Sequence, residues 1–108
     1  MSLLFENLEA ITKQLWAASN SRNVCSIKLA GENGYRLICP HGVFMSKQKK
    51  LMIACWQKSG FTLKGAAEGF KNLSLENCEN VMVLNKRFYK RRDFDPSDQM
   101  YGEWLFHI

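Results

Sequence analysis

The chain has 108 residues, 46% of them hydrophobic and 12% aromatic, so it can bury one hydrophobic core and is too apolar to be a disordered protein. Its formal net charge is +5, from 15 basic and 10 acidic residues, and the basic residues between Lys86 and Arg92 account for the whole of that excess. The longest unbroken apolar run, residues 51–56, is far shorter than the ~20 residues that cross a membrane.

We therefore expect a single domain, residues 1–108, without a membrane-spanning segment. The N-terminus lacks the pattern of a signal peptide, which favours a cytoplasmic location. The cysteines lack the close spacing of a disulfide framework or a redox motif, and we expect all of them to be reduced: Cys25, Cys39, Cys55 and Cys78.

The first 18 residues carry an apolar stripe at helical spacing. The pattern predicts a helix over residues 3–18, with Ser2 as its N-cap and residues 19–21 ending it. The stripe consists of Leu4, Leu8, Ile11 and Leu15.

Residues 24–42 predict a β-hairpin whose register depends on the turn. A two-residue turn, Asn33–Gly34, would mix polar and apolar groups on both faces. A three-residue loop, residues 32–34 with Gly34 left-handed, keeps one face apolar and is preferred. It pairs Leu29 with Leu37, Ile27 with Cys39 and Cys25 with His41.

Residues 51–56 fit a buried strand better than a helix capped by Ser46. After them, residues 62–73 predict a second helix with Thr62 as its N-cap, although Gly65 and Gly69 would each cost about 1 kcal/mol there. The helical stripe is Leu63, Ala66, Ala67, Phe70 and Leu73.

The remaining residues predict a strand from Val81 through the basic run, a turn near Pro96, and a last strand over residues 101–107 pairing back on it. The expected fold is α+β: two helices packed on one mainly antiparallel sheet, in the order α-β-β-β-α-β-β. An alternative makes residues 74–92 the second helix of a helix-turn-helix, but Glu76 and Glu79 would then repel DNA phosphates.

The segment "NKRFYKRRDF", Asn85 to Phe94, is the most unusual part of the sequence. Its cations can bind phosphates, and its aromatic rings can stack on unpaired bases. The alternatives are that these charges protect an exposed sheet edge or pair with Asp93, Asp95 and Asp98. The candidate nucleic-acid-binding residues are Lys86, Arg87, Phe88, Tyr89, Lys90, Arg91 and Arg92, with Lys49 and Lys50 as a second cluster.

No catalytic, cofactor or metal motif is present. Structural zinc sites use paired ligands such as Cys-x2-Cys, and the sequence contains no such pair. The residues that could each bind zinc are Cys39, His41, Cys55 and Cys78. We expect no cofactor, no metal and no enzyme activity. The sequence favours a non-enzymatic protein that binds nucleic acid, in single-stranded form. The alternative is a protein-binding regulatory module that docks on an acidic partner, with a homodimer as a possible assembly.

Overall fold

The computed structural model describes residues 3–108, and side chains from residue 7 onward. The predicted N-cap Ser2 and the side chain of Leu4 lie outside this part. The described residues form a small α+β domain with one antiparallel sheet of six strands. Its elements are α1 (Leu3–Ser21), β1 (Asn23–Leu29), β2 (Arg36–Met45), β3 (Leu51–Gly60), β4 (Gly69–Ser74), the short 3-10 helix η1 (Leu75–Asn77), β5 (Cys78–Arg87) and β6 (Glu103–His107).

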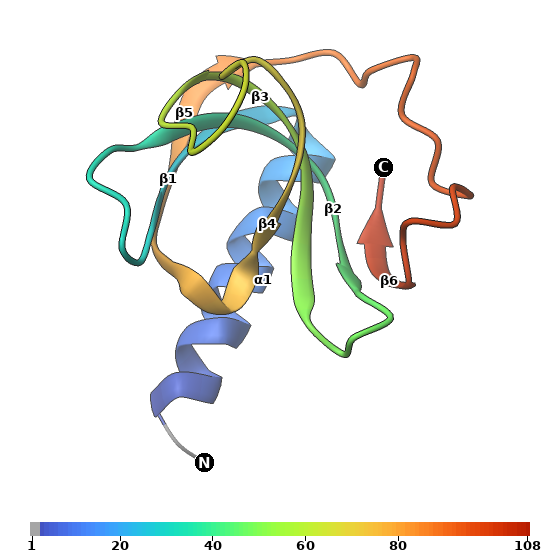
Figure 1. The fold of residues 1–108 in the computed structure, drawn as a ribbon, viewed down its shortest axis with the longest axis horizontal. Coiled ribbons are helices and arrows are strands. Elements are labelled where there is room, and N and C mark those ends of the chain that lie inside the picture. Colours follow the sequence, from blue (N-terminus) through green and yellow to red (C-terminus); the bar gives the residue numbers. More distant parts are fainter. Residues whose placement is uncertain (1–2) are drawn as a thin grey trace.

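The strands are ordered β4-β3-β2-β1-β5, and β6 pairs with β2. Figure 1 shows the strands curving around α1, while the segment after β5 runs along the top of the molecule to its right side, where β6 lies beside β2. The prediction of an α+β domain with an antiparallel sheet is confirmed. The predicted first helix and the strand over residues 51–56 are also confirmed, as α1 and β3.

Strand β2 is the centre of the fold because both of its edges pair with other strands and both of its faces are packed against other residues. One edge pairs with β3, and the other is shared by β1 near Arg36 and by β6 near Met45. Successive side chains of a strand point to opposite faces: Val43 joins the core beneath α1, while Phe44 joins a second cluster with Phe94. We call the α1 side of the sheet the inner face and the other side, covered by residues 88–108, the outer face.

The predicted hairpin register is wrong. Cys25 lies opposite Ile38 and Ile27 opposite Arg36, so residues 30–35 form a longer loop, and its left-handed glycine is Gly31. The physical reason is the buried guanidinium of Arg36, which the pattern of apolar residues did not reveal. It donates to both carboxylate oxygens of Glu32, at 3.0 and 2.7 Å, and to Gln57 Oε1 at 3.0 Å, holding the loop against β3.

The predicted second helix is also wrong, and the fold therefore has one α-helix within the described residues. Residues 61–68 are irregular and are followed by β4. Gly65 and Gly69 have φ of 76° and 145°, values that a right-handed helix excludes. In β4 the side chain of Leu73 packs into the inner core, while Phe70 contacts the Trp56 ring on the outer face.

The C-terminal half differs from the prediction in two further ways. Residues 78–87 form strand β5, so the helix-turn-helix alternative is excluded. The last strand does not pair back on the basic run but lies beside β2, with Gly42 opposite His107. The order of elements is thus one helix followed by six strands, with η1 between β4 and β5.

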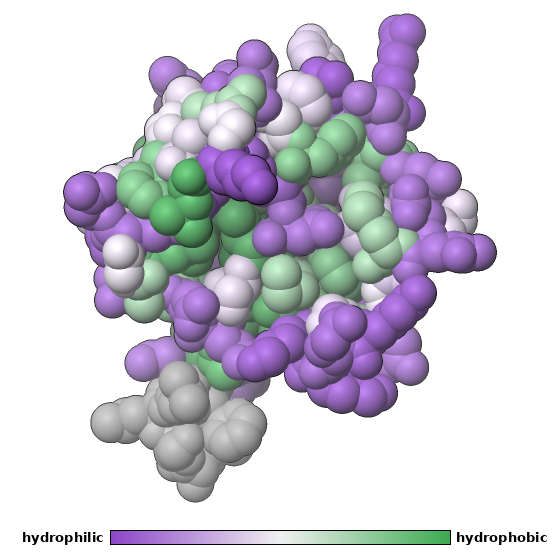
Figure 2. Space-filling view, viewed as in Figure 1, coloured by the Kyte–Doolittle hydropathy of each residue, from purple (hydrophilic) through white to green (hydrophobic). Residues whose placement is uncertain are grey.

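The face that carries β4 and the β1–β2 loop shows hydrophobic side chains across its middle and hydrophilic ones around them (Figure 2). Leu29 and Leu73 line a hollow of about 370 Å³ here, together with the Arg36 ion pair. Leu63, on its rim, is 81% exposed. Among the described residues, no helix is both long and apolar enough to cross a membrane.

Candidate nucleic-acid interface

The basic segment, defined as residues 86–92, begins in β5 and continues as a loop. The predicted strand through the whole basic run is wrong beyond Arg87, where β5 ends. Residues 88–92 have no strand structure and start the crossing onto the outer face (Figure 1). Because residues 88–92 leave the sheet, their side chains do not alternate between two faces as those of a strand would.

His41, on β2, fixes the position of this loop. It is fully buried, and its Nε2 accepts a hydrogen bond from the backbone N–H of Arg91 at 3.1 Å. Its Nδ1 lies 2.8 Å from the carbonyl oxygen of Cys39, so Nδ1 carries the proton and the ring is neutral. The ring also stacks on Phe88 at a centroid distance of 5.5 Å and contacts the edge of Phe94 at 5.0 Å.

The surroundings of His41 favour the neutral form. Burial lowers the pKa of His41 from its ordinary value, and the charges of Arg22, Lys90 and Arg91 lower it further, against the effect of the hydrogen bond to Cys39. A buried imidazole among cations gains its proton only in more acidic solution than a free one. The anchor of the basic segment is therefore intact at neutral pH.

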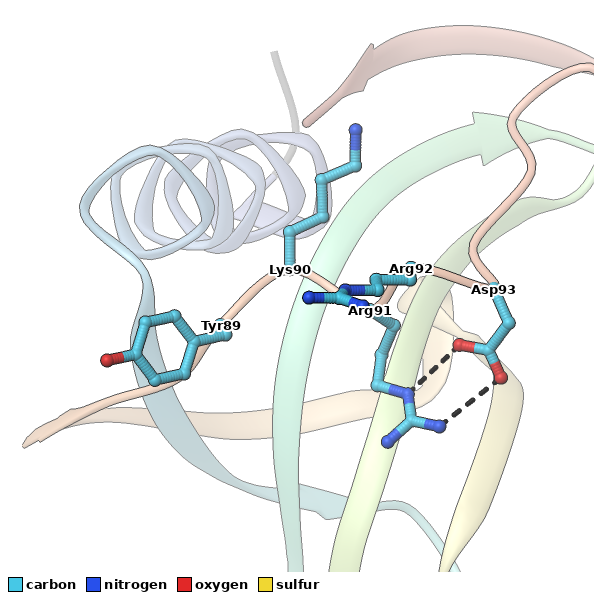
Figure 3. Close-up of a pocket in the computed structure, with 5 residues that line it drawn as sticks. All are labelled: Tyr89, Lys90, Arg91, Arg92 and Asp93. Atoms are coloured by element: carbon cyan, nitrogen blue, oxygen red, sulfur yellow. Dashed lines mark hydrogen bonds and ion pairs between the residues drawn. The ribbon is translucent and has the colours of Figure 1, made fainter.

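Arg91 is held on the outer face by two contacts, although its side chain remains 40% exposed. Its guanidinium carbon lies 3.7 Å from the centroid of the Trp56 ring, a cation–π contact. Its Nε and Nη2 donate to the two carboxylate oxygens of Asp93, at 3.1 and 3.2 Å, as Figure 3 shows. The hydrogen bond from Arg91 lowers the pKa of Asp93. The alternative that the aspartates pair with the cations of the basic segment thus holds for Arg91, whose charge is neutralised by Asp93.

The other two aspartates do not neutralise the segment. Asp95 accepts hydrogen bonds from the backbone and hydroxyl of Ser97, and Asp98 accepts one from the backbone of Met100. Both carboxylates therefore cap turns in the loop before β6. Among the side chains that the structure describes, those of Lys86, Lys90 and Arg92 form no ion pair.

The two aromatic rings of the segment have different surroundings. Phe88 is half-buried, and one face of its ring is covered by His41. Tyr89 is 95% exposed, and in Figure 3 its hydroxyl points away from Lys90, Arg91, Arg92 and Asp93. Both faces of the Tyr89 ring are thus accessible, whereas Phe88 serves mainly to hold the loop in place.

Two shallow pockets of about 370 Å³ each meet at Tyr89. One is lined by Tyr89 together with Lys90, Arg91, Arg92 and Asp93 (Figure 3). The other is lined by Arg22, Arg87, Phe88 and Tyr89. Arg22 was missed by the sequence analysis because only the pairing of Asn23 with Arg87 brings it beside the basic segment, and no local pattern marks that pairing.

The structure does not bring the second predicted cluster to this site. Lys49 and Lys50 lie in the β2–β3 turn, which Figure 1 shows at the opposite end of the molecule from residues 88–92. Lys58 is the lysine that belongs here instead. Burial raises the pKa of Cys39, and the nearby charges of Lys58 and Arg91 partly offset this effect.

The residues considered for metal binding do not gather into a site. Cys55 and Cys78 pack in the inner core, whereas the His41 ring lies among aromatic residues of the outer face. Both ring nitrogens of His41 already have partners. Within residues 7–108, no group of three potential ligands lies close enough to hold a metal ion.

Comparisons with known proteins add no family to this description. No family model matches the chain, and neither a curated protein nor a solved structure is significantly similar to it. The arrangement of side chains around the basic segment is therefore the basis for a functional proposal.

Proposed function

We propose that the protein binds single-stranded nucleic acid through the exposed side chains of the basic segment. The observation that carries the proposal is the position of Tyr89, 95% exposed and flanked by cations, on a loop whose backbone is anchored to His41. A single exposed ring is common on protein surfaces, so the cations that flank Tyr89 are what point to a nucleic-acid partner. Because the loop backbone is anchored, its binding side chains lose less conformational entropy than those of a free loop would when that partner binds.

The chemistry of these side chains fits an unpaired strand. An exposed tyrosine face can stack on any unstacked base, a contact worth about 1–3 kcal/mol, while lysine and arginine bind the phosphates on either side. Lys86, Lys90 and Arg92 are exposed and are not paired with described acids. Bases inside a duplex are already stacked and offer no face to Tyr89. We therefore expect preference for single strands.

The test is a titration of a fluorescent single-stranded octamer, and of its duplex, at several salt concentrations. Each phosphate contact contributes about 0.7 to the slope of log affinity against log salt, so these three cations alone should contribute about −2 to the slope. Replacing Lys86, Lys90 and Arg92 together by alanine should remove most of that contribution. Tyr89→Ala should weaken binding and leave the slope unchanged, because stacking releases no counterions.

Lys47→Ala is the matched control, since it removes an exposed lysine from the β2–β3 turn. It should bind as the wild type does. If the wild-type protein does not bind single strands at low salt, the proposal is wrong. An acidic protein partner would then be the remaining explanation for the unpaired cations.

A further inference from the structure

The pocket between α1 and the basic segment contains two arginines and two aromatic rings. Arg22 directly follows α1, and Arg87 is the last residue of β5. Both line a pocket of about 370 Å³ with Phe88 and Tyr89. None of these four lining residues is acidic, so no lining carboxylate competes with an anion for the guanidinium groups.

Both guanidinium groups are held by carbonyl oxygens at the C-terminal end of α1. Arg22 Nη1 donates to the carbonyl oxygen of Ser19 at 2.7 Å. Arg87 Nε and Nη2 donate to that of Ser21, at 3.1 and 2.7 Å. The last carbonyls of a helix lack partners within the helix and carry partial negative charge. These contacts orient the arginines, and each guanidinium retains N–H groups that they do not use.

The backbone of Arg22 is in a conformation that suits glycine better. Its φ is 59°, the left-handed position that commonly ends a helix and is usually occupied by glycine. An arginine there is strained by its Cβ. Its carbonyl oxygen accepts the N–H of Phe88 at 2.8 Å, which ties the end of α1 to the basic segment. The strained position places a guanidinium group where glycine would place none.

We propose that Arg22 and Arg87 form a phosphate-binding site next to Tyr89. Two oriented guanidinium groups match the oxygens of a phosphate in geometry and charge. The inference rests on the proposed function in one respect: the phosphate belongs to a nucleic acid whose neighbouring base stacks on Tyr89. Because Tyr89 also lines the second pocket, the strand continues across the ring toward Lys90 and Arg92.

The same phosphate chemistry has two sources, a phosphodiester within the strand and a terminal phosphate. The experiment compares a thymidine octamer with and without a 5′-phosphate, and inorganic pyrophosphate alone, in binding to the full chain. The variants are Arg22→Gly and Arg87→Gln, with Lys47→Ala as the control. Arg22→Gly relieves the backbone strain, so we expect its melting temperature to equal or exceed that of the wild type.

We expect each arginine variant to bind the octamers about tenfold more weakly, as for the loss of a charged hydrogen bond, with the salt slope reduced by about 0.7. An equal loss with both octamers identifies an internal phosphodiester, and a loss only with the phosphorylated one identifies a terminal phosphate. Pyrophosphate should bind the wild type and not the two variants.

The outcomes separate this inference from the proposed function. If the wild type binds the octamers and both arginine variants bind them as tightly, the phosphate site is wrong and the proposed function stands. If the wild type binds pyrophosphate through Arg22 and Arg87 but binds no octamer, the phosphate site stands and nucleic-acid binding is wrong. Binding of neither ligand overturns both.

Discussion

His41 shows how a single buried side chain can position a surface loop. Its two ring nitrogens bond the backbone of its own strand and the backbone of Arg91, and its ring is packed against Phe88 and Phe94. A neutral imidazole is both a donor and an acceptor, so the same ring can serve both strand and loop. A protonated ring has no acceptor and would lose the bond from Arg91.

The first prediction concerns the pH dependence of stability. The folded pKa of His41 is lowered by burial and nearby cations, so on acidification the unfolded chain takes up a proton near pH ~6.5 before the folded chain does. The free energy of unfolding should therefore be fully maintained above this pH and fall below it, by at most about 1.4 kcal/mol per pH unit.

Urea denaturation of the wild type and of His41→Gln between pH 7.5 and 5.5 tests this. The variant should be less stable at pH 7.5 but show a flatter pH dependence, because its side chain does not titrate. Any contribution of His107, which is exposed, is common to both proteins. Parallel curves for the two proteins would contradict the assignment of a neutral, anchoring His41.

At the residue scale, the sequence identified the cations and rings but not their neighbours. The composition of the basic segment was enough to mark Tyr89 and Lys90 as candidates for binding. It could not show that Arg91 lies on Trp56 or that Arg22 lies near Arg87, because these contacts join residues from distant parts of the chain. The number of cations in a segment can be read from the sequence, whereas the exposure and the contacts of each side chain depend on the fold.

At the scale of elements, the apolar pattern predicted α1 but gave a false helix over residues 62–73. Helical and strand periodicities are hard to distinguish in short segments that contain small residues. Gly65 and Gly69 were counted as modest costs in a helix, but their left-handed backbone shows that they belong to a loop and a strand end. The pattern was informative in α1 because it extends over several turns without glycine.

The second prediction concerns the close pairing of β2 with β6. A Cβ added to Gly42 would lie 2.5 Å from the carbonyl oxygen of Phe106 and 2.7 Å from a ring carbon of Trp104. Both contacts are too close for real atoms, so β6 would have to move. Gly42→Ala should lower the free energy of unfolding by about 1–3 kcal/mol, as overpacking does.

Gly34→Ala is the control for this substitution. A Cβ at Gly34 would meet Phe61 at 3.4 Å, an ordinary contact, and Gly34 is not among the glycines with positive φ. We expect its effect on stability to stay within about 0.5 kcal/mol. Had Gly34 been left-handed, as the sequence suggested, the loss would be about 1 kcal/mol. A larger effect at Gly34 than at Gly42 would refute this description of the pairing between β2 and β6.

At the scale of the whole molecule, the sheet has a core on each face. The inner core lies beneath α1 and contains Cys25, Cys55 and Cys78, and the outer cluster is covered by residues 88–108. All four cysteines are buried and reduced. Burial raises the pKa of each thiol, that of Cys25 to about 12. The reactive thiolate is therefore scarce in the folded protein.

The third prediction uses these thiols to ask whether the two cores unfold together. With a thiol reagent at pH 8, all four should react slowly and at one rate, set by opening of the whole domain. Cys39 is the informative residue, because it lies on the outer face, opposite Trp56 in the pairing of β2 with β3. A fast phase that disappears in Cys39→Ser would contradict one cooperative unit and show that the outer face opens alone.

The pairing of β2 with β6 also bears on when the binding surface forms. Gly42 lies opposite His107 and Asn23 opposite Arg87, so both pairings close long loops, which slows folding to roughly milliseconds or longer. Strands β1 to β4 pair with their neighbours along the chain and can assemble first. Residues 88–108 can pack on the outer face only after β2 and β3 are in place. We expect the rings and cations of the basic segment to reach their final positions late in folding, so that a partly folded chain cannot yet hold a ligand.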